Sequence, residues 1–240
     1  EKFGDKLKLF FNPICADHGN AIGAALEYYY QQTGKNPIPS YMSLYLGSSY
    51  SDEEVLFSAN RFNFKISKVN KIDSAIDLIE RGKVIGWFQG RSEFGPRGLG
   101  NRSILSLPTE QKYKDIVNEK VKKRESWRPF CPTIIEEKSN EFLKNPTYAP
   151  YMILGFEMKN PELYTAVSHI DGTCRPQILR KEVNPDFYHV VKGLNGIVLN
   201  TSFNLAGDPI VETPHDALIT LKNSEMDALL INDFLIEKCV

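Results

Sequence analysis

Apolar and polar residues follow a helical period in five stretches of the 240-residue chain. Residues 19–33 and 72–81 repeat small or apolar side chains at that spacing, and a glycine follows each stretch as a stop signal. Residues 51–59 open with Ser-Asp-Glu-Glu, which caps a helix and places acidic side chains in its first turn. Residues 110–120 and 214–222 complete the set, and the last stretch begins with a proline. The small residues of the first stretch predict a helix packed closely on a neighbour.

Shorter apolar runs between these stretches predict strands. They lie at residues 41–46, 84–88, 132–135, 151–158, 197–203 and 229–236. Residues 145–150 carry two prolines and an asparagine, which predicts a loop. Because helices and strands alternate irregularly, the pattern favours an α/β or α+β fold over a repeat architecture.

Composition and cysteine usage narrow the class of protein. A hydrophobic content of 42% and a charged content of 25% are ordinary for a globular domain. No apolar run approaches the ~20 residues that span a bilayer, so we expect a cytoplasmic protein without a membrane partner. Four scattered cysteines predict free thiols. A charge-stabilised thiolate at Cys131 or Cys174, which adjoin arginine-containing segments, is the weaker alternative.

The charge of the chain is small in total but unevenly distributed. The net charge of −1 argues against a general nucleic-acid surface. Residues 81–131, however, hold twelve Lys or Arg against five Asp or Glu. This asymmetry focuses positive potential on one region, as a phosphate-binding cleft requires. A solvated basic helix face is the alternative for the lysines taken alone.

The most informative segment is residues 90–103, which pack three arginines and four glycines between the apolar runs 84–88 and 104–107. Neighbouring arginines repel one another, and glycines cost stability where the backbone does not need them. A fold accepts both where its backbone approaches an anion with several oxygens, because arginine presents a planar fork of donors to phosphate or carboxylate. We therefore predict an anion site in this segment.

Three later clusters have the same character: residues 120–130, 169–177 and 199–210. Together they supply cations, hydroxyls and amides at turn-prone positions beside apolar runs, which is the composition of a polar pocket. Taken singly, each cluster is equally a surface turn or a cap. The sequence lacks a Walker-type phosphate loop, and its four histidines lack HxxxH spacing. His18 beside Asp17 is more often structural than a metal ligand.

The four clusters share a family resemblance. The blocks are GRxEFGPRxLGNRSI from Gly90, KxRExWRPF from Lys122, DGTxRxQ from Asp171 and NTSFN from Asn200. In this order they closely resemble the signature of the O-carbamoyltransferases of nodulation-factor and antibiotic biosynthesis, from about residue 82 to the C-terminus. Ser92 and Gly98 stand where the family pattern has methionine and alanine. Neither change alters a charge.

The resemblance implies two catalytic halves. Residues 71–240 correspond to a YrdC-like domain, a twisted mixed sheet with flanking helices that forms carbamoyl-adenylate from ATP and carbamoyl phosphate. Residues 1–70 correspond to the C-terminal piece of an actin/sugar-kinase-like domain, which transfers the carbamoyl group to a hydroxyl of a small-molecule or sugar acceptor. Asp17 is then one ligand of a divalent metal, with iron among the candidates. The other ligands lie in an N-terminal part of the same protein, so this chain is expected to be a C-terminal fragment with one incomplete site.

The catalytic candidates are cations that hold the phosphates and neutralise charge at the α-phosphorus: Arg97, Lys122, Arg128 and Arg175. The substrate- and nucleotide-binding candidates are the remaining polar residues of the four blocks: Arg91, Glu93, Asn101, Arg102, Arg124, Gln177, Asn200, Ser202 and Asn204. Mg²⁺ is implied by the ATP. Two alternatives stay open. Arg102 and Arg124 equally suit ion pairs with acids such as Glu93 and Glu125, and Glu93 equally suits the orientation of an arginine.

The alternative function is a YrdC-like RNA-binding module without adenylation activity. The positive charge of residues 81–131 permits it, although nucleic acid is not the expected partner. Sequence-independent RNA binding weakens strongly with salt and tolerates exchange of arginine for lysine. An adenylating site loses activity on that exchange, because the bidentate geometry is lost.

Overall fold

The computed structural model describes residues 13–14, 17, 19–36 and 43–239, within two compact units, Glu1–Leu44 and Tyr45–Val240. The first unit contains α1 (Gly19–Thr33), which has the predicted bounds and is followed by Gly34 at φ +67°. None of the α1 side chains is buried, so the predicted close packing is not found among the described residues. The strand predicted at 41–46 falls partly outside the described residues. Its remainder forms only a bridge from Tyr45 to Glu93, within the second unit.

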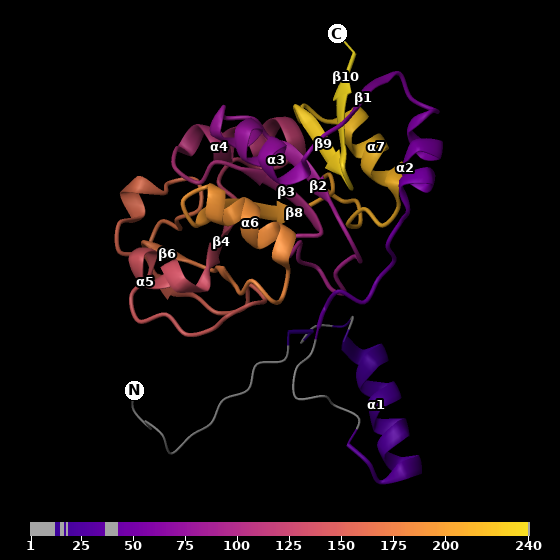
Figure 1. The fold of residues 1–240 in the computed structure, drawn as a ribbon. Coiled ribbons are helices and arrows are strands. Elements are labelled where there is room, and N and C mark those ends of the chain that lie inside the picture. The colour runs from indigo at the N-terminus through magenta and orange to yellow at the C-terminus, as the bar shows by residue number, and fades with distance from the viewer. Residues whose placement is uncertain (1–12, 15–16, 18, 37–42, 240) are drawn as a thin grey trace. The chain divides into compact units, whose positions relative to one another are not determined.

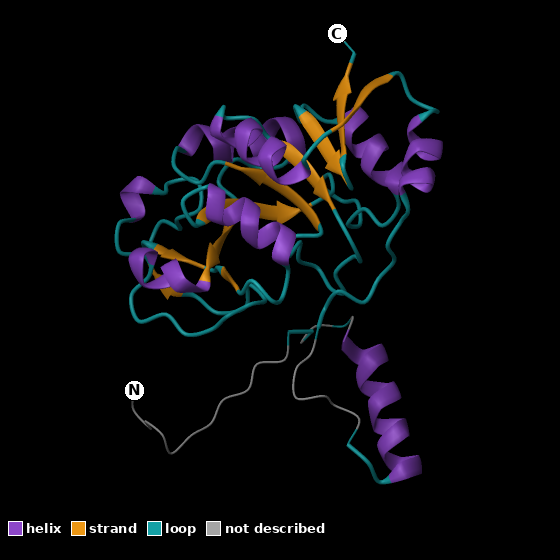
Figure 2. Cartoon of the chain, in the orientation of Figure 1, coloured by secondary structure: helices purple, strands orange, loops and turns teal. Residues whose placement is uncertain are grey.

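An eight-stranded mixed sheet runs through the second unit (Figures 1 and 2). Its order is β1-β10-β9-β2-β3-β8-β4-β7, with β2/β9 and β4/β7 parallel and the other pairs antiparallel. Its strands are β1 (Phe64–Lys68), β2 (Ile85–Phe88), β3 (Arg102–Ser106), β4 (Cys131–Ile135), β7 (Gln177–Leu179), β8 (Ile197–Ser202), β9 (Ala228–Ile231) and β10 (Phe234–Lys238). A separate ribbon pairs β5 (Phe156–Glu157) with β6 (Thr173–Cys174).

Helices cover both faces of this sheet. Successive residues of a strand point to opposite sides, so each strand places apolar side chains on both faces. On β2, Ile85 and Trp87 belong to a core shared with α3 (Lys71–Glu80) and α6 (Pro185–Gly193). Phe88, one residue on, belongs to the opposite core. That core includes side chains of the remaining longer helices: α2 (Asp52–Ala59), α4 (Gln111–Asp115), the π-helix η2 (Ile116–Lys122) and α7 (Pro214–Asn223). Figure 1 shows α2 and α7 side by side next to β9. The result is a three-layer arrangement.

Several predicted elements are confirmed at their expected places. The helices at 51–59, 72–81 and 214–222 appear as α2, α3 and α7, and the expected N-terminal cap of α2 is a capping box between Ser51 and Glu54. The strands at 84–88, 132–135 and 197–203 appear as β2, β4 and β8. Residues 145–150 form the predicted loop. Among the described residues, no helix has the length and apolar character that crossing a membrane requires.

Other predictions were wrong in ways that have a physical reason. The run at 229–236 is a hairpin, because Asn232 adopts φ +48° and reverses the chain between β9 and β10. The helix predicted at 110–120 starts as α4 but widens into η2 and extends to Lys122. Only β5 forms in the strand predicted at 151–158. The remaining short elements are η3 (Glu136–Lys138), α5 (Ser139–Phe142) and η4 (Pro161–Leu163).

Candidate active site

Arginines from three separate blocks converge on one small cavity, which we call the arginine pocket. Its lining comes from the loop after β2, the segment between η2 and the start of β4, the loops before β5 and β7, and the end of β8. The lining residues are Pro96, Arg97, Gly98, Arg124, Pro129, Phe130, Cys131, Met152, Arg175, Asn200, Thr201 and Ser202. The volume of about 90 Å³ is below the roughly 300 Å³ of the smallest drug-sized pockets. The cavity therefore suits a phosphate-sized group, and a whole nucleotide must extend beyond it.

The pocket concentrates positive charge without a compensating acid. None of its described lining residues is acidic. Burial and the neighbouring Arg175 lower the pKa of Arg97. Burial, with a further contribution from Arg128, lowers the pKa of Arg124 to about 10. Lowered pKa values on guanidinium groups mean that their charge is poorly solvated here, and an anion in the pocket relieves that cost.

The three guanidinium groups differ in how they are held. Arg124 Nε donates to Asn118 Oδ1 at 2.7 Å, and its guanidinium lies over the Phe130 ring at 4.8 Å. Arg175 Nη2 lies 3.5 Å from the sulfur of Cys131, and its buried Nε has no hydrogen-bond partner among the described residues. For Arg97, the described residues supply no side-chain hydrogen bond or ion pair. Arg97 and Arg175 thus keep donors available for a ligand.

A buried amide network lies at the floor of the pocket. Gln177 donates to the backbone oxygen of Leu99 at 2.8 Å and accepts from Thr133 Oγ1 at 2.9 Å. Asn200 Nδ2 donates to the same Thr133 oxygen at 2.9 Å. The Oδ1 of Asn200, a residue only 1% exposed, has no partner among the described residues. An unsatisfied buried acceptor costs about 1–3 kcal/mol, so a ligand donor at this point is favoured.

Lys122 is tied to the end of β8 rather than directed into the pocket. Its ammonium donates to the backbone oxygen of Ser202, to Ser202 Oγ at 3.2 Å and to Asn204 Oδ1 at 2.6 Å. Burial, followed by the nearby Arg124 and Arg128, lowers the pKa of Lys122 well below its usual value. Ser202 also lines the pocket, so Lys122 positions the pocket wall and adds positive potential beside it.

Four candidates of the 90–103 segment fold the loop that presents Arg97. Glu93 Oε1 accepts from the backbone N–H groups of Leu99, Asn101 and Arg102 at 2.6, 2.7 and 3.2 Å. The fully buried Arg102 donates to the backbone oxygens of Gln89, Gly90, Asn101 and Ser48, and stacks 3.5 Å from the Phe88 ring. Arg91 donates to the backbone oxygens of Leu46 and Gly47. Asn101 bonds Arg91 O and Asn184.

These contacts choose between the alternatives that the sequence left open. The charged groups of Arg91 and Arg102 bind backbone oxygens, and Glu93 binds backbone N–H groups. The alternative of an Arg102–Glu93 ion pair is not found, and Glu93 is linked to Arg102 through its backbone N–H. Arg124 pairs with an amide rather than with Glu125. We therefore treat Arg91, Glu93, Asn101 and Arg102 as loop framework and place Arg97, Arg124 and Arg175 at the pocket.

Arg128, like Lys122 and the four loop residues, does not line the pocket, and Asp17 belongs to the first unit. Arg128 is half exposed, and its nearest acid is Glu125 at 3.9 Å. Asp17 is exposed in the first unit, and the described residues contain no group of three or more His, Cys, Asp or Glu placed to hold a metal ion. His18 and Cys15 lie outside the described residues. The metal-binding role of Asp17 stays a prediction.

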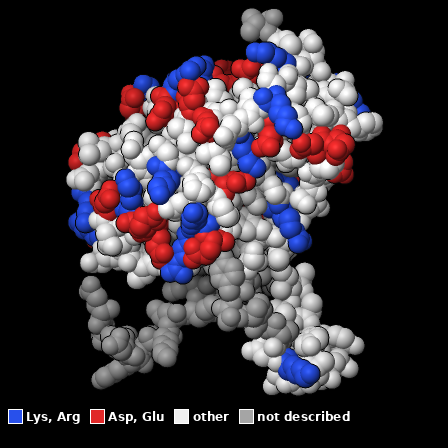
Figure 3. Space-filling model, viewed as in Figure 1, with Lys and Arg blue, Asp and Glu red and all other residues white. Residues whose placement is uncertain are grey.

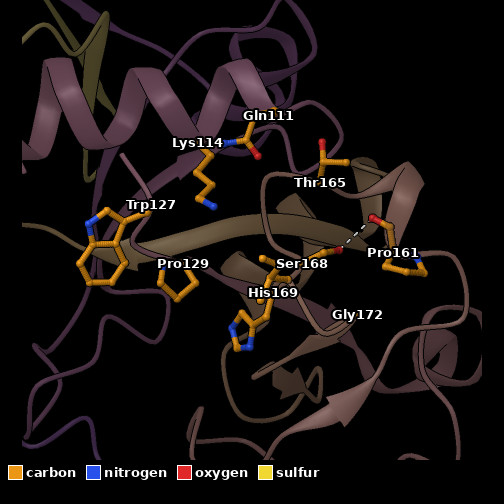
Figure 4. Close-up of a pocket in the computed structure, with 10 residues that line it drawn as sticks. Gln111, Lys114, Trp127, Pro129, Pro161, Thr165, Ser168, His169 and Gly172 are labelled. Carbon is orange, nitrogen blue, oxygen red and sulfur yellow. Dashed lines mark hydrogen bonds between the residues drawn. The ribbon is translucent and has the colours of Figure 1, made fainter. Parts of the chain in front are cut away.

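A larger cavity of about 800 Å³ adjoins the arginine pocket and shares Pro129 with it. Figure 4 shows Lys114 of α4 directed between Trp127 and Pro129 on one side and Thr165 and Ser168 on the other. Burial lowers the pKa of His169, another lining residue. Sequence reasoning did not select these residues as site residues. The signal for this cavity that the sequence offered was the tryptophan inside the second block, Trp127. In the structure, 73% of its surface is accessible.

Outside these cavities the charge is mixed. Figure 3 shows basic and acidic residues interspersed over the face of the second unit that is in view. Several lysines of the 81–131 region pair with acids, among them Lys83 with Asp227 at 2.9 Å and Lys120 with Glu225 at 3.5 Å. Arg97 and Arg124, the two basic residues of this region that line the arginine pocket, form no ion pair with an acid among the described residues.

The comparison with protein families agrees with the four blocks. The family described as "Carbamoyltransferase C-terminus" matches residues 76–238, which contain the whole arginine pocket. The chain belongs to this family. Nodulation protein NolO of Bradyrhizobium diazoefficiens is 37% identical over 244 residues, covering 96% of the chain and 44% of NolO. A 3'-hydroxymethylcephem-O-carbamoyltransferase of Amycolatopsis lactamdurans is 27% identical, covering 97% of the chain and 44% of that enzyme. The chain spans less than half the length of these curated relatives.

Solved structures confirm the fold of this carbamoyltransferase-family chain. HypF in its phosphate- and nucleotide-bound form superimposes with a TM-score of 0.53 at 17% identity, over 69% of the chain and 25% of HypF. P. abyssi Sua5 complexed with L-threonine gives 0.51 at 13% identity, over 72% of the chain and 49% of Sua5. At such identities the similarity shows the fold alone, which is the predicted YrdC-like mixed sheet with flanking helices.

Proposed function

We propose that this chain forms carbamoyl-adenylate from ATP and carbamoyl phosphate, as the C-terminal part of an ATP-dependent O-carbamoyltransferase. Water cleaves carbamoyl phosphate into carbamate and inorganic phosphate. A carbamate oxygen then attacks the α-phosphorus of ATP and expels pyrophosphate. The longer protein then transfers the carbamoyl group to a hydroxyl of a small-molecule or sugar acceptor. Membership of the carbamoyltransferase family supports the group that is transferred, and the family relatives support a hydroxyl as the acceptor.

The observation that carries the proposal is the cluster of Arg97, Arg124 and Arg175 around a phosphate-sized cavity without an acidic residue. Two phosphorylated substrates side by side repel each other strongly in a poorly hydrated site. Guanidinium groups offset that repulsion and neutralise the charge that develops at the α-phosphorus. Positioning and electrostatics of this kind need no protein nucleophile.

The shape of the neighbouring cavity supports a place for the rest of the nucleotide. The arginine pocket is too small for ATP, and the larger cavity continues from it at Pro129. Trp127 and Pro129 give that cavity an apolar wall suited to a nucleobase, and Lys114 supplies a cation (Figure 4). We place phosphate and carbamoyl groups in the arginine pocket and the nucleoside against Trp127.

Magnesium enters this proposal as the ion that the ATP phosphates carry. Nucleotide-bound Mg²⁺ keeps several waters and takes few protein ligands, which fits a site without a described cluster of acids. The ion adds charge compensation to that of the arginines. The protein residues bind the phosphates, and the buried floor orients them.

The test is pyrophosphate release by the purified chain with ATP, Mg²⁺ and carbamoyl phosphate. Arg97→Lys and Arg175→Lys are expected to lower the carbamoyl-phosphate-dependent rate by a factor of about 10²–10³, the loss typical of removing one charge-stabilising donor. Arg81→Lys is the matched control, because Arg81 pairs with Asp77 on the exposed surface of α3.

Two results would contradict the proposal. The first is a folded chain that binds neither carbamoyl phosphate nor pyrophosphate in calorimetry. The second is full activity of both pocket variants. The RNA-binding alternative predicts no carbamoyl-phosphate-dependent pyrophosphate release, and an RNA affinity that tolerates both lysine variants and falls steeply with salt.

A further inference from the structure

Cys131 is the only cysteine among the described lining residues of the arginine pocket, and the proposed reaction does not use it. It begins β4, pairs with Asn200 of β8 and is a free thiol. Its side chain is 8% exposed, and that exposure opens into the pocket that it lines. The sulfur is thus accessible to a molecule small enough to enter the pocket and shielded from larger ones.

The surroundings of this sulfur are cationic. Arg175 Nη2 lies 3.5 Å from it. Burial lowers the pKa values of Arg97 and Arg124, and the charge of Cys131 acts in the opposite direction, which means that each guanidinium attracts an anionic sulfur. Reactive cysteines in proteins occupy such electropositive, partly accessible positions, because the thiolate is the nucleophilic form.

A second cysteine lies nearby but has the opposite character. Cys174, in β6, is fully buried, and burial together with the charge of Cys131 raises its pKa to about 12. Near neutral pH it is therefore almost entirely a thiol, which attacks an oxidised sulfur poorly. An oxidised Cys131 then lacks an efficient resolving partner in Cys174.

We propose that Cys131 is an oxidation site that closes the arginine pocket. The thiolate attacks one oxygen of hydrogen peroxide, the O–O bond breaks, and a sulfenic acid and hydroxide form. The hydroxide then takes the proton of the sulfenic acid, which gives a sulfenate and water. Sulfur is oxidised and peroxide is reduced. The sulfenate keeps a negative charge on an oxygen inside a cavity of about 90 Å³, where it pairs with the guanidinium groups and excludes phosphate. Free thiols in solution restore the reduced state.

This inference rests on the proposed function only for its consequence, which is redox regulation of adenylation. The chemistry of the sulfur itself depends on the arginine charges and not on catalysis. The two ideas therefore fail separately when reactivity and pyrophosphate release are measured on the same protein.

The first experiment compares an anionic and a neutral alkylating reagent. Iodoacetate and iodoacetamide react with the purified chain, and mass spectrometry follows each cysteine by its own peptide. The iodoacetate-to-iodoacetamide rate ratio at Cys131 is expected to exceed that of the exposed Cys239 by roughly tenfold, the lower end of what a cleft of one charge sign gives. Inorganic pyrophosphate is expected to protect Cys131 and leave Cys239 unchanged.

Variants of Arg97 and Arg175 separate the effect of arginine charge from the effect of bidentate hydrogen bonding. Arg97→Gln and Arg175→Gln are expected to bring the Cys131 ratio down toward that of Cys239. Arg97→Lys keeps the charge and is expected to keep the ratio, although it loses pyrophosphate release under the proposed function. Equal ratios at Cys131 and Cys239 in the unchanged chain, or no protection by pyrophosphate, would overturn the assignment.

The second experiment treats the chain with hydrogen peroxide and measures pyrophosphate binding by calorimetry. A sulfenate at Cys131 is expected, and dimedone detects it in one portion of the sample. In an unlabelled portion the affinity for pyrophosphate is expected to fall tenfold or more, and dithiothreitol is expected to restore it. Cys131→Ala is expected to bind with the same affinity before and after peroxide. Undiminished binding by the oxidised chain, or a Cys131–Cys174 disulfide as the product, counts against the proposal.

Discussion

At the scale of single residues, Glu93 controls the loop that presents Arg97 to the pocket. One carboxylate oxygen accepts three backbone N–H groups between residues 99 and 102, and the other is buried without a partner among the described residues. Burial raises the pKa of Glu93 above its usual value, against the effect of the three N–H donors. The folded state therefore binds a proton at Glu93 more tightly than the unfolded state.

The pH dependence of stability follows from that direction. A raised pKa in the folded state contributes stability at low pH, and this contribution is lost as pH rises through the folded-state value. Glu93→Gln cannot ionise. The free energy of unfolding of the unchanged chain, minus that of Glu93→Gln, is expected to fall between pH 4 and pH 8 by on the order of 1 kcal/mol. Urea unfolding at both pH values measures it, and a rise in the difference contradicts the prediction.

Residue identity predicted the chemistry of the site better than it predicted each residue's partner. Arg97 and Arg175 were selected as cations and lie at the pocket. Arg102, from the same block, is consumed by backbone oxygens of residues 48, 89, 90 and 101. The motif does not show that Arg102 binds backbone oxygens, because only tertiary structure decides which carbonyl groups come within reach of a guanidinium. Ser48 in particular lies 54 positions away in the sequence.

At the scale of elements, the segment at residues 46–48 is fastened to the arginine-bearing loop. Arg91 donates to the oxygens of Leu46 and Gly47, and Glu212 accepts from Ser48 N and from Ser92 Oγ. Ser92, which departs from the family pattern, therefore supplies one of the hydrogen bonds of this fastening. A methionine at this position could not donate to Glu212.

Removal of the Arg91 side chain tests this fastening. Arg91→Ala leaves two carbonyl groups without their charged donor, and hydrogen exchange at the amides of Gly47 and Ser48 is expected to accelerate about tenfold or more, because local opening costs less free energy. Exchange in β3 and β8 is expected to stay unchanged. Arg61→Ala, at an exposed position on a Phe57 ring, is the control. Uniform acceleration across the sheet would falsify a local role.

The end of η2 is a second element that sequence patterns did not foresee. Periodicity at 110–120 predicts an ordinary helix, since apolar spacing hardly distinguishes an α-helix from a π-helix. The widened turn carries the element to Lys122, and Lys123 ends it in the left-handed region at φ +53°. This turn directs Lys122 toward Ser202 and Asn204.

A substitution pair tests the left-handed end. Lys123→Gly is expected to keep or raise the free energy of unfolding by up to about 1 kcal/mol, because glycine adopts positive φ without steric cost. Lys123→Val is expected to lower it by about 1–2 kcal/mol, since a β-branched residue is disfavoured there. Lys120→Gly, inside η2, is the control and is expected to lower it by about 1 kcal/mol. Equal losses for both glycine variants in urea unfolding contradict the assignment.

At the scale of the whole molecule, the sheet order explains why four distant blocks share one site. β3, β8, β4 and β7 are neighbours in the sheet although they are spread from Arg102 to Ser202 in the sequence. The pocket lies where the ends of β8 and β4 meet the loops before β3 and β7. Alternation of helices and strands predicted the fold class. It did not give this order, because pairing between distant strands is set by their packing in the folded sheet.

The division into two compact units leads to the last prediction. Both hydrophobic cores draw all their buried residues from positions 55–236, within the second unit. Because these cores contain the main apolar contribution to stability, a chain of residues 45–240 is expected to fold on its own. Its urea midpoint is expected to match that of the full chain, and it is expected to bind pyrophosphate with the same affinity.

Truncation at residue 71 is the contrasting variant, since it removes α2 and the edge strand β1 that pairs with β10. That shorter chain is expected to unfold at markedly lower urea. Equal midpoints for the two truncations would show that residues 45–70 add nothing to the second unit.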